Sequence, residues 1–303
     1  YNNISRLFNA NGLRYNFKSS AIHPLDNIYL SSLYLYGKIM PKLKLWQDND
    51  GGMKKLWVKM CYEDFADEVV IVGKDWPYEF SWDYIQTVFQ EGFDKSTGDW
   101  AFWMDIDTMF HEKSFEKIKE ELKKYGDSPA IAFPKYQIFT PDRYHMKTHL
   151  VVALNKKIFP YIKMNGGGDK LQPTINGNLI EISNIPKSTE PVWNYDSIFR
   201  TKEIIKEDRA RFARAWNRYF KDLGGRGGEL PDEAYDAWLS MVLERYQYHV
   251  LKLKIDDHPK YIRDSLKELD ESNFGYSMFG QKNKIKRKPI HYVKAYRSRY
   301  FSK

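Results

Sequence analysis

The sequence lacks several features that would place the protein in a particular class. It contains one cysteine, Cys61, so no disulfide can form within the chain, which suits a reducing compartment. It has no run of eighteen apolar residues, so no transmembrane segment is expected. No secretory signal is visible in the stretch that begins at Tyr1. Together these absences predict a cytoplasmic protein.

Acidic residues are absent after Glu271, so the charge of the chain is unevenly distributed. The chain has 48 basic and 40 acidic residues, which gives a net charge of +8. Nine of the basic residues follow Glu271, and the rest of the chain has 39 basic against 40 acidic residues, a net charge of −1. Aromatic residues alternate with the nine: Tyr292, Tyr296, Tyr300 and Phe301. This basic tail suits a nucleic-acid backbone with stacked bases or an anionic membrane surface, and it is equally typical of a solvated or disordered terminus.

Apolar residues are plentiful and follow an alternating pattern. With 42% hydrophobic and 16% aromatic residues, a chain of 303 residues is expected to be globular. Apolar runs bounded by charge and glycine predict strands, and apolar residues at helical intervals predict helices. The expected strands are 67–73, 98–107 and 129–133, and the expected helices are 80–93 and 115–125. Strand, helix, strand, helix, strand predicts an α/β fold whose sheet is mostly parallel and Rossmann-related, with helices on its faces.

The most informative segment is 98–107, which ends in two carboxylates one residue apart. Alternate side chains of a strand share a face, so Asp105 and Asp107 are expected to project together while Ile106 points into the core. Two hard oxygen ligands at the carboxyl end of a strand suit Mg²⁺ or Mn²⁺ with bound phosphates. The alternative is that the pair caps a helix that begins near Glu112. Asp48 and Asp50 have the same spacing but lie in a polar turn without an apolar strand before it.

Four segments carry the pattern of one enzyme family. They are 21–27, with a proline turn before an expected helix through Leu30, Leu33 and Leu35; 67–75; 98–107; and 191–195 with 200–203. Over residues 20–215 they resemble the inverting family-two glycosyltransferases, which have the GT-A fold. The resemblance implies transfer of a sugar from a nucleotide-sugar donor, expected to be UDP-linked, to a hydroxyl group.

The resemblance also implies roles for individual residues. The expected metal ligands for Mn²⁺ or Mg²⁺ are Asp105, Asp107 and Asn194. Asn194 stands where the family has a histidine. The expected donor-binding residues are Pro24, Asp75 and Asp105. Inversion needs one general base on the acceptor side, and the candidates are Asp169 first, then Glu181 and Asp196.

The expected domain organisation follows from these segments. Residues 1–200 form a GT-A-like nucleotide-sugar-binding and catalytic domain, 201–271 a helical extension and 272–303 the basic tail. The acceptor is expected to be a glycan, with a nucleic-acid acceptor such as a hydroxymethylated base, recruited by the tail, as the alternative. Two other classes stay open: a metal-dependent phosphoryl-transfer enzyme, and a nucleic-acid or membrane adaptor whose aspartate pair only caps a helix.

Overall fold

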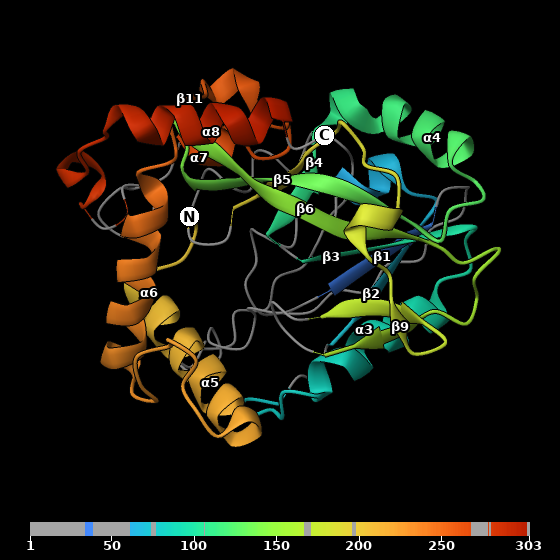
Figure 1. Cartoon of the computed structure of the whole chain (residues 1–303), viewed down its shortest axis with the longest axis horizontal. Helices are drawn as coiled ribbons and strands as arrows, with labels where there is room; N and C mark the ends of the chain where they lie inside the picture. The colour runs from blue at the N-terminus through green and yellow to red at the C-terminus, as the bar shows by residue number, and fades with distance from the viewer. Residues whose placement is uncertain are drawn as a thin grey trace, which may run out of the picture.

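A computed structural model shows a mixed α/β protein built on one large sheet (Figure 1). The structure describes residues 61–73, 77–105, 107–166, 171–195, 198–267, 278 and 280–301, together with the backbone of 34–38. The strands of the large sheet follow the order β2, β1, β3, β6, β5, β10, β4, and β11 pairs with β6. Their bounds are β1 (Tyr34–Lys38), β2 (Glu68–Val72), β3 (Trp100–Asp105), β4 (Thr108–Phe110), β5 (Ala130–Thr140), β6 (Arg143–Asn155), β10 (Val192–Asn194) and β11 (Leu251–Lys252).

Strand direction differs from the sequence-based expectation. Among the described strands of this sheet, only the pair of β5 and β10 is parallel, and every other pair is antiparallel. The expectation of a mostly parallel sheet is therefore not confirmed. The main reason is a long hairpin in which β5 and β6 are joined by Pro141 and Asp142 alone. A connection this short can only link antiparallel strands, because a parallel crossover needs a dozen or more residues.

Two helices cover opposite faces of the sheet, α3 (Tyr84–Lys95) and α4 (Phe115–Lys124) (Figure 1). Alternation along β3 and β5 divides the core between them. The small side chains Ala101, Ala130 and Ala132 lie in the cluster that contains the buried face of α3. Larger neighbours such as Phe102 and Phe133 lie in the cluster that contains the buried face of α4. Both helices, together with β2 and β3, confirm the periodic pattern of the sequence, and the short strand β4 between β3 and α4 was not expected.

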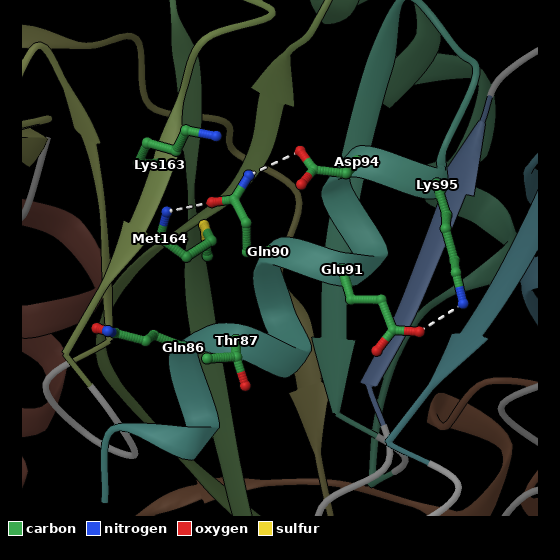
Figure 2. A pocket seen from close by; sticks show the side chains of 8 residues that line it. All are labelled: Gln86, Thr87, Gln90, Glu91, Asp94, Lys95, Lys163 and Met164. Atoms are coloured by element: carbon green, nitrogen blue, oxygen red, sulfur yellow. Dashed lines mark hydrogen bonds and ion pairs between the residues drawn. The ribbon is translucent and has the colours of Figure 1, made fainter.

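A small second sheet packs beside α3. It contains β7 (Lys163–Asn165), β8 (Gln172–Ile175) and β9 (Asn178–Leu179). The Gln90 side chain accepts a hydrogen bond from the Met164 backbone N–H at 2.8 Å (Figure 2). It also donates one to the Ile162 carbonyl at 3.4 Å, so it pairs with this segment as a neighbouring strand would. One turn earlier, Gln86 accepts from the Gly166 N–H at 2.9 Å. An open groove of about 670 Å³ lies here, and none of the expected site residues lines it.

The last third of the chain is mainly helical in its described residues but returns to the sheet. After α5 (Lys202–Phe220) and α6 (Pro231–Tyr246), which pack on each other, β11 adds a strand to β6. Pro231 opens α6 as expected, since its missing N–H has no partner in a first turn. The remaining elements are α7 (Arg263–Lys267), α8 (Pro289–Phe301) and the short 3₁₀-helices η3 (Glu112–Ser114), η5 (Ile182–Asn184), η6 (Ile255–Asp257) and η8 (Lys282–Lys284).

One expected helix is wrong in the described part of the chain. Leu35 was expected in a helix with Leu30 and Leu33, but it lies in β1, which pairs with both β2 and β3. Tyr34, Leu35 and Tyr36 are bulky residues that favour a pleated sheet, and pairing on both sides satisfies the backbone. Leu30 and Leu33 lie outside the described residues. Within the described residues, no helix is both long and apolar enough to cross a bilayer.

Candidate functional site

Asp105 and Asp107 lie where β3 ends and turns into β4, as the sequence predicts. Asp105 is the last residue of β3 and is half-buried, while Asp107 lies in the turn and is 9% exposed. The turn is held at three points. The Thr108 hydroxyl donates to the Asp105 carbonyl (2.7 Å), the Tyr62 hydroxyl to the Thr108 carbonyl (3.0 Å), and the Tyr195 N–H to the Asp107 carbonyl (2.8 Å). The backbone that carries both carboxylates is therefore tied to neighbouring elements.

Asn194 is brought to this turn by strand pairing. It lies opposite Thr108 in the antiparallel pair of β10 and β4. Its Nδ2 donates a hydrogen bond to Asp107 Oδ1 at 3.1 Å, and the Asn194 side chain is buried. An amide N–H cannot bind a cation, so in this arrangement Asn194 orients the Asp107 carboxylate. The sequence-based expectation that these two residues lie together is met, and their metal-binding role stays a prediction.

A buried arginine that is not among the expected site residues also faces Asp107. Arg200 Nη2 lies 3.8 Å from Asp107 Oδ2, and Arg200 Nη1 donates to Asp208 Oδ2 at 3.0 Å. Arg211 Nη1 lies 4.0 Å from Asp208 Oδ1, and Arg211 Nε donates to the Tyr78 carbonyl at 2.7 Å. All four charged side chains are at most 9% exposed, and two positive charges balance two negative ones.

The sequence contained a signal for this network. Asp208 follows the buried Ile205 by three residues, and the half-buried Phe212 follows Asp208 by four, so Asp208 lies on the apolar stripe of α5. A charge at such a position is rarely buried unless it is paired. Arg211, on the following turn, supplies one partner, and Arg200, before the helix begins, supplies the other.

The residues at this turn fit a divalent ion that is shared with a phosphate ligand. Asp105 and Asp107 offer two carboxylates, whose oxygens are the hard ligands that such ions prefer. Mg²⁺ and similar ions are commonly held by one or two carboxylates and complete their shell with water and phosphate oxygens. Among the described residues, no three His, Cys, Asp or Glu side chains gather into a site made of protein ligands alone. Two carboxylates alone would leave the rest of the shell of such an ion to water and substrate oxygens.

Glu181 is the one other expected site residue in the described part of the chain, and no hydrogen bond or ion pair seen for it in the structure reaches this network. Glu181 is exposed at the start of η5, where its carbonyl accepts from the Asn184 N–H at 3.0 Å. The remaining expected residues lie outside the described part of the chain: Pro24, Asp75, Asp169 and Asp196. Comparison of the chain with models of known protein families and with curated protein sequences finds no match. The site must therefore be interpreted from its own chemistry.

A buried tyrosine and histidine pair fixes the end of β10 beside Asn194. His258 Nε2 lies 2.7 Å from the Pro141 carbonyl, and His258 Nδ1 lies 2.9 Å from the Tyr195 hydroxyl. Because a carbonyl only accepts, Nε2 carries the proton, and the tyrosine hydroxyl donates to Nδ1. Burial lowers the pKa of His258 to about 4, because the charged imidazolium would lose its hydration. The histidine is thus held neutral.

We expect this neutral histidine to make the fold less stable in mild acid. The unfolded chain binds the proton near the ordinary pKa of 6.5 and the folded chain only near 4, so stability is lost as the pH falls through that interval. The loss for His258 alone is about 2 kcal/mol at about pH 5. Between about pH 7 and pH 5 both proteins should lose stability. The loss in the free energy of unfolding should be about 2 kcal/mol smaller in His258→Gln than in wild type. Urea unfolding at both pH values measures it.

Each protein is compared with itself across pH, so a general destabilisation by the substitution cancels from the result. Burial also lowers the pKa of His145 to about 4 and that of His249 well below its usual value, so part of the acid sensitivity should persist in the variant. An equal loss of stability in wild type and His258→Gln would contradict a neutral His258.

Proposed function

We infer that this protein is a metal-dependent glycosyltransferase that moves a sugar from a nucleotide-sugar donor to a hydroxyl group with inversion. The observation that carries this proposal is the turn after β3, where Asp105 and Asp107 follow a buried strand and Asn194 and Arg200 orient the second carboxylate. The mixed α/β fold, with helices on both faces of the sheet, supports it. A GT-A arrangement of the sheet belongs to the same proposal.

On the donor side of the reaction, the site must compensate the negative charge of the leaving group. A nucleoside diphosphate leaves with negative charge that must be compensated for the sugar to be released. Asp107, with Asp105 nearer the ribose, would hold Mn²⁺ or Mg²⁺, and the bound ion would supply that compensation. The Asn194 N–H and the Arg200 guanidinium hold the Asp107 carboxylate in one orientation before the substrate arrives. Arg200 is itself fixed by Asp208, so the carboxylate has a rigid support.

The acceptor side needs a general base that removes the proton of the attacking hydroxyl. We assign this role to Asp169, which follows the glycine run 166–168, and we assign the acceptor to the glycans. Gln86 and Gln90 tie the backbone of Gly166 and Met164 to α3, so the segment leading to this run has a fixed starting point. A carboxylate there could accept a proton once donor and acceptor are bound.

Asp169→Asn should reduce turnover by about 100-fold, which is typical for loss of a positioned base, and should keep donor binding. Glu181→Gln and Asp196→Asn are matched comparison variants, and both should retain most of the activity. Hydrolysis of the nucleotide sugar, followed as release of nucleoside diphosphate, measures turnover. Calorimetry measures donor binding separately. If one comparison variant shows the loss instead, the base is that residue, and if none of the three does, the assignment of a base among them is wrong.

Calorimetry with UDP tests the donor site itself. UDP should bind in the presence of Mn²⁺, and its affinity should fall by at least about tenfold in EDTA. The diphosphate would then face Asp107 without a compensating cation. A sugar-free nucleotide is used so that turnover cannot complicate the measurement. Binding that is unchanged by EDTA would contradict the metal-dependent site, and absence of binding by UDP and by other nucleoside diphosphates would contradict a nucleotide-sugar donor.

A further inference from the structure

Helix α8 has apolar contacts on one face and exposed apolar side chains on the opposite face. His291 and Ala295 are buried, and Ala295 belongs to the core cluster beside α4. At about 100° per residue, Val293 lies on the opposite side of the helix from these two. Val293 is 61% exposed and Ile290 50%. One face of α8 therefore holds it on the protein, and the other presents hydrophobic surface to solvent.

This exposure is concentrated rather than scattered. Nine large hydrophobic side chains are strongly exposed in the described part of the chain, and four of them belong to this helix of thirteen residues: Ile290, Tyr292, Val293 and Tyr296. Single exposed hydrophobic residues are common on protein surfaces, whereas a cluster marks a contact site.

The surface around this cluster is strongly basic. The exposed cations in and just before α8 include Lys284, Lys286, Lys288 and Arg297. No acidic residue occurs after Glu271, so no carboxylate of the tail compensates them. Three neighbouring cations have contacts within the protein. Lys282 pairs with Asp142 at 3.0 Å, the Arg287 guanidinium lies 4.6 Å from the centre of the Tyr246 ring, and Lys294 Nζ lies 5.9 Å from the centre of the Tyr248 ring. The four exposed cations give this surface a positive charge that suits an anionic partner.

The aliphatic residues indicate which anionic partner fits. Single-stranded nucleic acid binds by stacking bases on flat rings, which Tyr292 and Tyr296 offer but the more exposed Ile290 and Val293 do not. They suit insertion among acyl chains, while tyrosine rings and lysine side chains suit the headgroup layer around them. Thirteen residues of helix are about 20 Å long, too short to cross a hydrocarbon core of about 30 Å. A helix of this kind lies on a bilayer.

We propose that α8 is a membrane-docking surface that binds the anionic face of a lipid bilayer, with Ile290 and Val293 inserted below the headgroups and the surrounding lysines and Arg297 against them. The proposal does not depend on the glycosyltransferase assignment, because none of the residues at the turn after β3 takes part in it. It replaces nucleic acid with a lipid surface as the partner of the basic tail.

Sedimentation of the full chain with vesicles tests the proposal. Vesicles of phosphatidylcholine with about 30 mol % phosphatidylserine should bind the protein at least about tenfold more tightly than pure phosphatidylcholine vesicles, and added salt should weaken the binding. Ile290→Ser/Val293→Ser should reduce binding to the anionic vesicles by at least about tenfold. Leu230→Ser is the matched control, because Leu230 is 63% exposed at the start of α6 and should leave vesicle binding unchanged.

Three results would overturn the proposal. The first is full vesicle binding by the double variant, which would mean that α8 does not insert. The second is binding of a single-stranded oligonucleotide, but not of vesicles, by the intact chain. The third is a dimer that the double variant converts to a monomer in light scattering, without any vesicle binding, because the cluster would then contact a second copy. Circular dichroism of the double variant should match wild type, since both side chains are at least half exposed.

Discussion

Asp107→Ala is expected to abolish donor turnover, by at least about 1,000-fold, and to remove its dependence on a divalent ion at the same time. The Asp107 carboxylate is held in place by two neighbouring side chains, with Asn194 Nδ2 at 3.1 Å from Oδ1 and Arg200 Nη2 at 3.8 Å from Oδ2. Its removal takes away the proposed ligand and leaves the diphosphate charge uncompensated. Nucleoside diphosphate release with Mn²⁺ and with EDTA measures turnover, and the electron paramagnetic resonance of Mn²⁺ measures binding of the ion.

Asp107→Asn and Asp99→Ala make the result specific. Asp107→Asn keeps the size of the side chain but removes its charge, so it should lose turnover with a smaller effect on folding. Asp99 lies just before β3 and is exposed, with Lys157 Nζ at 3.1 Å from its Oδ2, so Asp99→Ala should retain wild-type turnover and Mn²⁺ binding. Full turnover in either Asp107 variant, or equal loss in Asp99→Ala, would contradict the assignment.

Asp208→Ala should lower the free energy of unfolding by about 3–5 kcal/mol. Asp208 is the carboxylate that faces both Arg200 and Arg211, and removing it leaves two buried guanidinium groups short of negative charge. Removal of one partner from a buried ion pair costs this much because the remaining charge stays desolvated. Urea unfolding at neutral pH gives the value.

Glu203→Ala is the control for this prediction. Glu203 lies on the exposed first turn of the same helix, α5, and its loss should cost less than about 1 kcal/mol. A loss of less than about 1 kcal/mol in Asp208→Ala as well would mean that water compensates the two arginines, and that Arg200 is not rigidly held beside Asp107. The two variants therefore decide whether the network supports the site.

The local elements of the fold could be predicted from the sequence because they depend on local patterns. Phe115, Ile118 and Leu122 are spaced for one helix face, and α4 buries all three. Strand pairing depends on distant partners, so the apolar runs at 129–133 and 149–154 did not reveal that they are parts of one hairpin. One signal was present, since Pro141 followed by Asp142 is typical of a tight turn between strands.

The candidate site could be predicted where its residues follow a strand and not where they come together by tertiary packing. Asp105 and Asp107 were placed by the apolar run before them, and Asn194 by a resemblance in the segment around it. The contact of Arg200 with Asp107 joins segments that are far apart in the chain, so no local pattern encodes it. The burial of Asp208 was visible only as a charge on an apolar helix stripe.

Turnover of a panel of nucleotide sugars by the intact chain tests the proposed function most directly. The panel should include UDP-, GDP- and other nucleotide-linked sugars, each with Mn²⁺ and each with EDTA, and mass spectrometry should follow release of the nucleoside diphosphate. We predict release from at least one donor with Mn²⁺, and its loss in EDTA and in Asp107→Ala. Release from no donor, or release that persists in EDTA and in Asp107→Ala, would contradict a metal-dependent glycosyltransferase built on the turn after β3.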